Sequence, residues 1–417
     1  MQTDSETTAA ASTAHWPAIF DVAVIGGGPS GAIAAEWLAA RGRTVLLVDP
    51  GDRIKPCGGA IPCRTLEDFA ITPDMLVARA HAARIIAPSG KAVEMRIGTA
   101  GYVGMVDRAS FDPYLRDRAA AAGALRYTGR LEAITERAGE PLALTLSPSR
   151  KAAPGCGPAE VKARLVIGAD GANSAVRRLM FSPADKPRYV FAYHEIIETP
   201  AVPDPTTFKA DRCDVIYDGR ISPDFYGWVF PHGGQVSVGC GSGIKGHDLR
   251  RATGALREAA GLDTARTIRR EGAPLPLKPM GRWDNGRNVL LIGDAAGTVA
   301  PSSGEGIYYA LQGGLLAAEA VDDCLRTGRT AALKTVRKRF MKAHGRVFLI
   351  LGILQAVWYR SDRMREKFVT MCADPDVQRL TWESYLEKRI TRRDPLAHLR
   401  VFLRDLKQLL TPAARQK

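Results

Sequence analysis

The chain has 417 residues, of which 46% are apolar and 24% charged, a composition typical of a globular protein with two or three domains. Its seven cysteines show no zinc-type spacing, and the sequence has no nucleic-acid motif and no run of aromatic residues interleaved with basic ones. The composition excludes a disordered chain, and the cysteine spacing argues against a zinc site. The net charge of +14 needs an anionic partner, and the missing motif argues against nucleic acid as that partner.

Residues 1–18 are polar, without a basic start or an apolar core, so we expect a flexible extension and no secretion signal. From Ile19 the pattern predicts a buried strand over 19–25, a glycine-rich turn, a helix over 30–41 and a second buried strand over 44–49. This order is typical of the β-α-β unit of a Rossmann-type domain.

The glycine-rich turn has the spacing G-x-G-x-x-G, formed by Gly26, Gly28 and Gly31. These glycines permit a tight turn, a close approach of the backbone to a pyrophosphate and close packing of helix on strand. The helix N-terminus offers unpaired N–H groups to phosphates. Asp49, at the end of the second strand, can accept hydrogen bonds from ribose hydroxyls. The unit predicts a dinucleotide site but does not separate FAD from NAD.

Two later strand ends favour FAD. The first predicted strand, in VIGADG, ends in Asp170-Gly171, and the second, in NVLLIGDAAG, is followed by Gly293 and Asp294. The candidate cofactor-binding residues of the second region are Gly293, Asp294, Gly297, Gly304 and Gly306. A carboxylate at a strand end can bind the ribityl hydroxyls of a flavin, and a following helix N-terminus can face its pyrophosphate or ring. A helix is expected over 108–122, with Asp107 as its cap.

The expected fold class is α/β, with an α+β insertion: a Rossmann-type FAD-binding domain, an inserted antiparallel-sheet substrate domain and a C-terminal helical region. The expected boundaries are 19–75, 100–180 and 275–330 for the FAD-binding domain, 76–99 and 181–274 for the β-rich substrate domain, and 331–417 for the basic helical region.

Over about residues 19–325, including the stretch DRASFDPYL, the sequence resembles the flavoprotein family typified by para-hydroxybenzoate hydroxylase. The resemblance implies that Arg108 contacts FAD and that Asp294 binds the ribityl chain. It also implies that Asp170 supports the cofactor from behind the groups that touch it.

Three further stretches indicate the chemistry: KPCGGAIP at 55–62, PDFYGWVFPHGGQVSVGCG at 223–241 and APSSGEGIYYAL at 300–311. The second fits PxxYxWxFPxGxxxxVGxG at every specified position. Together they resemble the geranylgeranyl reductases, above all the branch acting on chlorophyll or bacteriochlorophyll. The resemblance implies stepwise reduction of three isolated double bonds of a geranylgeranyl chain to give phytyl. The substrate would be the geranylgeranylated pigment or geranylgeranyl diphosphate, with NADPH as electron source.

Reduction of an isolated alkene needs a hydride at one carbon and a proton at the other, in a dry and well-aligned site. Cys57 is the expected proton donor or relay, because a thiol is mostly protonated at neutral pH. The alternative for Cys57 is a small residue that fits a crowded turn beside Gly58 and Gly59, which we place at the substrate. Glu305 and Tyr308 are further relay candidates, with helix capping as the alternative for Glu305.

Three aromatic residues alternate along one predicted strand and therefore share a face: Tyr226, Trp228 and Phe230. They are expected to wall an isoprenoid slot beside the flavin, with Tyr226 and Trp228 also in the catalytic set and Pro231 next to the substrate. A packed core is the alternative. Lys55 is expected to meet a diphosphate or carboxylate of the substrate, with a solvated loop charge as the alternative.

The predicted helical tail contains the apolar run VFLILGILQAVWY at 347–359, with Arg346 before it and Arg360, Arg363 and Arg365 behind it. A run of about 13 residues is too short for a bilayer, which needs about 20. A buried helix explains the run, whereas a surface helix on anionic lipid explains both the run and its basic flanks. We expect a cytoplasmic protein, and peripheral contact with the photosynthetic membrane stays open.

Two other functions stay open on sequence alone. A flavin monooxygenase of the same fold would bind FAD identically, but the KPCGG loop and the YxWxFP strand argue against it. A non-catalytic prenyl- or pigment-binding flavoprotein is the other, and the intact cofactor residues Arg108, Asp170 and Asp294 argue against that one.

Overall fold

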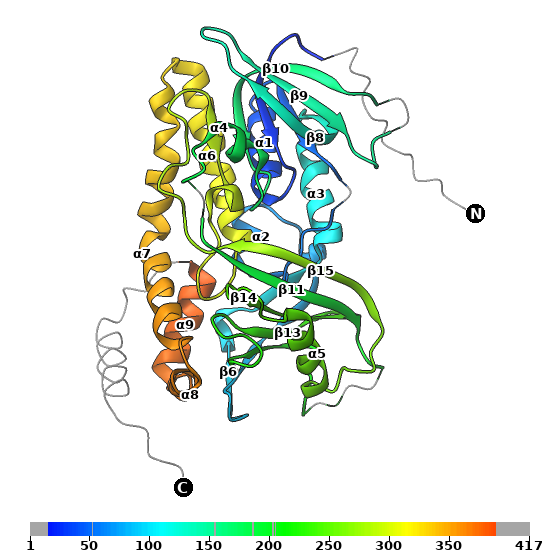
Figure 1. Ribbon diagram of the computed structural model, residues 1–417, viewed down its shortest axis with the longest axis vertical. Helices are drawn as coiled ribbons and strands as arrows, with labels where there is room; N and C mark the ends of the chain where they lie inside the picture. The colour runs from blue at the N-terminus through cyan, green and yellow to red at the C-terminus, as the bar shows by residue number, and fades with distance from the viewer. Residues whose placement is uncertain are drawn as a thin grey trace, which may run out of the picture.

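The computed structural model describes residues 16–388, apart from 52, 154–155, 186, 202–203 and 205. A parallel sheet with its helices forms one half of the molecule, a larger sheet forms the other, and helix α7 (Lys334–Trp358) runs along both (Figure 1). Most of the predicted N-terminal extension and the tail beyond Lys388 lie outside the described residues.

The parallel sheet has β1 (Phe20–Ile25) at its centre, because β1 pairs with both β2 (Val45–Asp49) and β10 (Ala159–Gly168). On the outer sides, β8 (Leu125–Thr135) pairs with β2, and β16 (Val289–Leu291) pairs with β10. Strand β9 (Leu142–Pro148) is antiparallel to β8 and β10. Strands that are buried on both faces read as continuous apolar runs, which is why the sequence revealed them.

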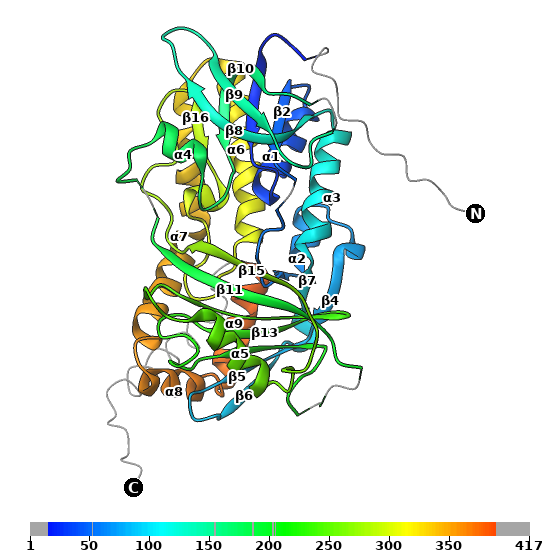
Figure 2. The ribbon, with the colours of Figure 1, turned by 45° about the vertical axis from the view of Figure 1, so that its right-hand side comes forward.

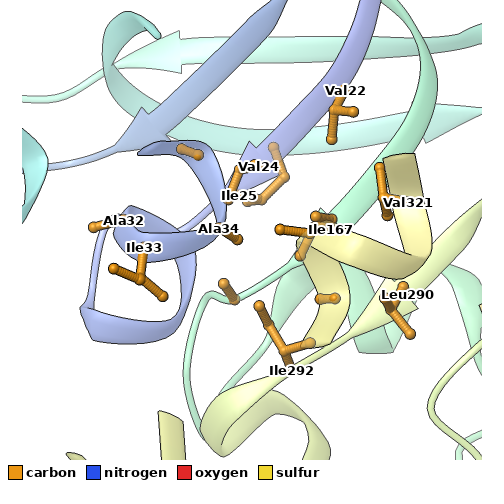
Figure 3. Packing of buried hydrophobic residues seen from close by; sticks show 14 of the residues in the cluster. Val22, Val24, Ile25, Ala32, Ile33, Ala34, Ile167, Leu290, Ile292 and Val321 are labelled. Carbon is orange, nitrogen blue, oxygen red and sulfur yellow. The ribbon is translucent and has the colours of Figure 1, made fainter. Parts of the chain in front are cut away.

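Helix α1 (Pro29–Ala39) packs against α3 (Arg108–Ala121) and α6 (Ile307–Thr327). The core between sheet and helices joins residues that are far apart in the sequence, as the close approach of Val24, Ile167 and Val321 shows (Figure 3). The predicted cap of α3 is confirmed, because the Asp107 side chain accepts a hydrogen bond from the Ala109 N–H.

The inserted sheet has seven strands in the order β15-β11-β14-β13-β12-β5-β6 (Figure 2). They are β5 (Ala82–Ile86), β6 (Ala92–Arg96), β11 (Tyr189–Glu198), β12 (Arg212–Ile216), β13 (Gly227–His232), β14 (Gln235–Ser242) and β15 (Thr267–Pro276). All neighbours are antiparallel except β12 and β5. Helix α5 (Leu249–Ala259) packs on β14 and β11. The predicted α/β class with an antiparallel insertion is confirmed.

One strand crosses a boundary that we expected for this insertion, and another lies inside the expected segment 76–99 but pairs with strands outside it. Strand β15 continues past 274 to Pro276, and β4 (Leu76–Ala80) pairs with β7 (Val103–Val106) in a separate small sheet with β3 (Ala60–Pro62). Helix α2 (Arg64–Asp68) follows β3 directly.

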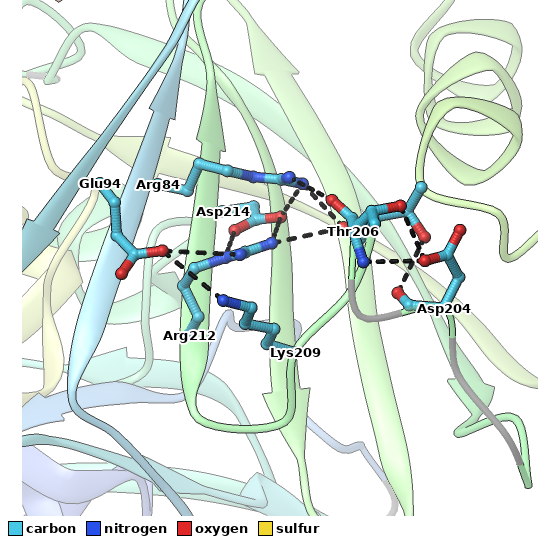
Figure 4. A network of polar contacts seen from close by, with 8 residues as sticks. Arg84, Glu94, Asp204, Thr206, Lys209, Arg212 and Asp214 are labelled. Atoms are coloured by element: carbon cyan, nitrogen blue, oxygen red, sulfur yellow. Dashed lines mark hydrogen bonds and ion pairs between the residues drawn. The ribbon is translucent and has the colours of Figure 1, made fainter.

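An ion-pair network braces the far edge of the inserted sheet (Figure 4). The buried Arg212 donates a hydrogen bond of 2.7 Å to the Asp214 carboxylate. Arg84 donates both to Asp214 and to the Thr206 carbonyl. Because side chains alternate along a strand, the residues between these charges face the other way. Cys213 and Ile85 accordingly line the cavity described below.

The helical tail folds back onto both halves. Helix α7 packs on α6 and leads into α8 (Asp362–Met371) and α9 (Pro375–Glu387). The predicted C-terminal helical region is therefore confirmed as far as Lys388. The tail also has a role that the sequence did not predict, because residues of all three helices line the cavity.

Candidate functional site

A cavity of about 1120 Å³ connects the end of the parallel sheet with the inserted sheet and the tail helices. Ligand pockets usually measure roughly 300–1,000 Å³, so this one has room for a dinucleotide and part of a second ligand. Most of the predicted site residues lie on it, including Cys57, Arg108, Asp170 and Asp294.

The glycine turn forms one end of the cavity. Gly26 has a φ of +106°, and a Cβ there would lie 2.3 Å from the Ala169 carbonyl oxygen. Gly28 ends the turn, and no side chain caps the N-terminus of α1, so its N–H groups are available to a ligand. Asp49 lies beside the turn, where it accepts the Gly27 N–H at 2.7 Å and pairs with Arg116 at 3.4 Å.

The two strand-end carboxylates differ in their partners. Asp170 uses one oxygen to accept the N–H groups of Ala175 and Val176, while its other oxygen is buried without a partner. Burial raises the pKa of this carboxyl. Asp294, the residue expected to bind the ribityl chain, is buried and paired with Lys55. Lys55 is therefore occupied by Asp294 and is not free to bind an anionic group of the substrate.

The buried Arg108 faces the cavity, where the Asp112 carboxylate holds its guanidinium through two hydrogen bonds of 2.6 and 2.7 Å. Gly304 and Gly306 also line the cavity, whereas Gly293 and Gly297 do not. Gly293 begins the short helical turn Gly293–Ala296, and Gly297 follows it. These features fit an FAD molecule. The uncapped N-terminus of α1 and the close-packed Gly26 suit its phosphates, and the unpartnered Asp170 oxygen suits a polar group of the cofactor.

The predicted aromatic wall faces the same cavity. Tyr226, Trp228 and Phe230 all line it, with ring centroids 6.0 and 6.4 Å apart in succession. The Tyr226 hydroxyl donates to the Ser303 carbonyl at 2.6 Å, and burial raises the pKa of Tyr226, so this phenol stays neutral. Pro231, predicted beside the substrate, is buried and does not line the cavity.

The Cys57 turn packs directly on this wall. Cys57 lines the cavity, and its sulfur accepts the Gly59 N–H at 3.3 Å, a contact that suits the turn-fitting alternative. A Cβ on Gly58 would lie 3.2 Å from Phe230. Gly59 has a φ of +71°, and a Cβ there would lie 2.6 Å from Nε2 of His232.

His232, behind this turn, makes stability depend on pH. Burial lowers its pKa to about 4, whereas an unfolded histidine titrates near about 6.5. Between these values the unfolded chain binds a proton that the folded chain does not. We therefore expect this group to remove up to about 3 kcal/mol of stability as the pH falls from about 6.5 to 4.

Urea unfolding at a series of pH values measures this effect. His232→Gln should flatten the pH dependence of the unfolding free energy, and the exposed His81→Gln should leave it unchanged. Equal slopes for wild type and His232→Gln would show that His232 does not titrate in this way.

The loop before α6 carries a buried ion pair. Glu305 lines the cavity and pairs with Lys388, which ends α9, and the second Glu305 oxygen is buried without a partner. Tyr308 points elsewhere, because its hydroxyl donates to Asp68 at 2.8 Å, and it does not line the cavity. Its neighbour Tyr309 does, since consecutive residues of a helix face different directions.

Several site residues were missed from the sequence because no local motif marks them. His194, Glu271 and Lys388 meet partners that are distant in the chain. Arg365, expected among lipid-facing basic residues, is 2% exposed and donates to the Pro223 and Tyr359 carbonyls. It thereby ties the tail to the start of the aromatic strand.

A family model described as an FAD binding domain matches residues 20–344. The chain is 50% identical to the geranylgeranyl diphosphate reductase of Rhodobacter capsulatus, over 94% of this chain and 97% of that protein. It is 36% identical to the enzyme of the same name from Synechocystis, over 94% and 98%. A solved structure from Thermoplasma acidophilum, described as geranylgeranyl bacteriochlorophyll reductase-like, aligns with a TM-score of 0.76 and 22% identity, over 94% and 99%. At that identity the last match shows the fold alone.

Proposed function

The chain belongs to the geranylgeranyl diphosphate reductase family of FAD-dependent oxidoreductases, and we propose that it reduces the isolated double bonds of a geranylgeranyl chain to a phytyl chain. The observation that carries the proposal is one continuous cavity that has the FAD-binding residues at one end and the aromatic wall beside them. Bound FAD, when reduced, supplies the hydride. The protein supplies a dry, apolar channel that aligns the alkene.

The headgroup of the substrate is proposed as either a diphosphate or a (bacterio)chlorophyll. The names of the relatives support the diphosphate, and the resemblance of KPCGGAIP and SSGEGIYYA supports the pigment. A test incubates the FAD-loaded protein anaerobically with each substrate and a chemical reductant, followed by mass analysis. Products that gain two, four and six hydrogen atoms are expected, and no reduced product from either substrate would refute the proposal. A monooxygenase would make no product without oxygen.

We propose NADPH as the electron donor, reacting transiently at the flavin, because the sequence shows no second dinucleotide-binding unit. Mixing the oxidised protein anaerobically with NADPH or NADH and following the flavin absorbance tests this. Bleaching by NADPH well ahead of NADH is expected. A flavin that neither nucleotide reduces would point to a different donor.

We propose a cytoplasmic location with peripheral contact between α7 and an anionic membrane. By length and composition alone, Thr330–Trp358 is apolar enough to cross a membrane, contrary to our expectation from its shorter apolar run, and only 17% of its most apolar window is buried. One side of α7 lines the cavity with Val347, Leu351 and Leu354. This favours a helix that lies on the surface over one that spans.

The opposite side of α7 carries the apolar side chains of Leu349 and Ile353, which are 64% and 54% exposed. Ile350 lies between the two sides, because it lines the cavity and is also 45% exposed. Exposed basic residues stand before and behind these apolar side chains, including Arg346 and Arg360. An apolar stripe between cations suits the boundary between anionic headgroups and acyl chains. A lipid-soluble prenyl substrate would then be taken up where the protein rests.

Ile353→Glu is expected to weaken binding to anionic lipid vesicles at least about tenfold, since it replaces an apolar contact worth roughly 1.5–3 kcal/mol by a like-charged group. Vesicle co-sedimentation measures the change. The control is Ile244→Glu, because Ile244 is 53% exposed on the inserted domain. Equal binding of the two variants would remove α7 as the contact surface.

A further inference from the structure

The cavity reaches the surface of the described part of the chain at two places of opposite character. The exposed residues among those that line it form two groups. The first is polar and lies on the FAD-binding half: Arg53, Arg130, Glu132, Asn173 and Arg178. The second consists of Ile350 on α7, which is 45% exposed, and Thr381 on α9. We call the opening bordered by Ile350 and Thr381 the slot.

The slot lies between two helices that each turn one side toward the cavity. The lining residues are Val347, Ile350, Leu351 and Leu354 on α7, and Val377, Leu380, Thr381 and Ser384 on α9. Their spacing of three and four residues places each set on one side of its helix. The end of α9 lies beside α7, where burial and then the Lys388 charge lower the pKa of His344 to about 4. None of the eight lining side chains is charged, so an apolar chain can pass between them.

The part of the cavity behind the slot offers no free cation to a charged headgroup. Of the described residues of the inserted sheet and the tail helices that line the cavity, only Lys388 carries an ammonium or guanidinium group, and it is paired with Glu305. Burying an unpaired charge costs several kcal/mol, whereas each buried CH₂ of a prenyl chain gains about 0.8 kcal/mol. These opposite preferences favour a substrate that buries its chain and leaves a diphosphate in water.

We infer that the geranylgeranyl chain enters the cavity through the slot between α7 and α9, with its far end first, while the headgroup stays at the surface. The inference rests on the proposed function. The polar opening lies among the FAD-binding residues, which leaves the slot to the apolar chain.

This orientation has two consequences for the substrate. One channel can serve a diphosphate or a pigment headgroup, because neither group has to enter the protein. The double bond next to the headgroup, which a phytyl chain retains, stays nearest the slot. The three bonds that are reduced lie farther along the chain, in the part that passes into the cavity.

Stopped-flow binding to the oxidised, FAD-loaded protein tests the slot without any chemistry. Trp228 and Trp382 line the cavity, so their fluorescence reports the arrival of geranylgeranyl diphosphate. Ile350→Phe combined with Thr381→Phe places a ring on each side of the slot. A narrowed entrance slows association and dissociation alike. We therefore expect both rate constants to fall at least about tenfold while Kd stays within about twofold of wild type.

Wild-type association in the double variant would overturn the slot as the entrance, and so would a changed Kd with an unchanged association rate. The control is Ala356→Phe, because Ala356 is an exposed residue of α7 that does not line the cavity. It should bind at the wild-type rates, and equal slowing there would also overturn the inference. FAD content shows that each variant is folded, and the single variant Ile350→Phe carries the test if the double variant lacks FAD.

Two labelled substrates test the direction of entry. A geranylgeranyl chain that carries biotin at its headgroup end should still bind and be reduced, whereas a chain that carries biotin at its far end should not bind. Binding of the second chain at the rate of the first would overturn entry by the far end. Binding of geranylgeranyl diphosphate to wild type without any reduction would instead count against the proposed function and leave the entrance in place.

Discussion

Replacing Gly31 by alanine is expected to abolish FAD retention. A Cβ at Gly31 would lie 1.8 Å from the Gly26 carbonyl oxygen and 3.0 Å from Ala169, so the added methyl would meet backbone and not a mobile side chain. Packing of α1 against both α3 and α6 opposes a movement of the helix start away from the Gly26 carbonyl. Overpacking of this kind typically lowers stability by about 1–3 kcal/mol. Because the displaced turn also carries the N–H groups expected to bind the pyrophosphate, we expect FAD affinity to fall at least about a hundredfold.

The flavin absorbance of the purified protein, per mole of chain, measures this loss. Gly254→Ala is the matched control, because Gly254 also lies in a helix but a Cβ there meets nothing within 4 Å. That change should add roughly 0.5–1 kcal/mol of stability and leave FAD content unchanged. A Gly31→Ala protein with full FAD content would contradict the pyrophosphate role of this turn.

The cofactor end of the site was predictable because its signals are local. Gly26 and Asp49 belong to one β-α-β unit, and Asp107 caps a helix that starts at the next residue. Buried parallel strands appear in the sequence as unbroken apolar runs. The ends of two such runs gave the positions of Asp170 and Asp294.

The substrate end was predicted less completely, because pairing across the fold leaves no local signal. Lys55 and Asp294 are 239 residues apart in the sequence, and Arg365 and Pro223 are 142 apart. A motif also does not say which side of a helix faces a cavity, so SSGEGIYYA pointed to Tyr308 where the structure has Tyr309 on the wall. The tail was read as either buried or lipid-facing, yet α7 has one cavity-lining side and one exposed side.

Lys388→Met is expected to lower the free energy of unfolding by about 3–5 kcal/mol, because it leaves the buried Glu305 carboxylate without its countercharge. The side chains of both residues are at most 4% exposed, and the Lys388 ammonium also lies 4.0 Å from the centre of the Tyr385 ring. Burial raises the pKa of Glu305 and lowers that of Lys388, so each charge depends on the other to stay in place.

Urea unfolding of a double-mutant cycle separates the pair from its parts. Lys388→Met with Glu305→Gln should recover most of the loss, since no buried charge then remains, whereas the exposed Lys338→Met should cost little. A single variant as stable as wild type would mean that the pair does not form. Because Leu380, Trp382 and Tyr385 of α9 line the cavity, Lys388→Met should also weaken binding of a prenyl ligand. The same ion pair thus holds the last described helix in place, and with it one wall of the cavity.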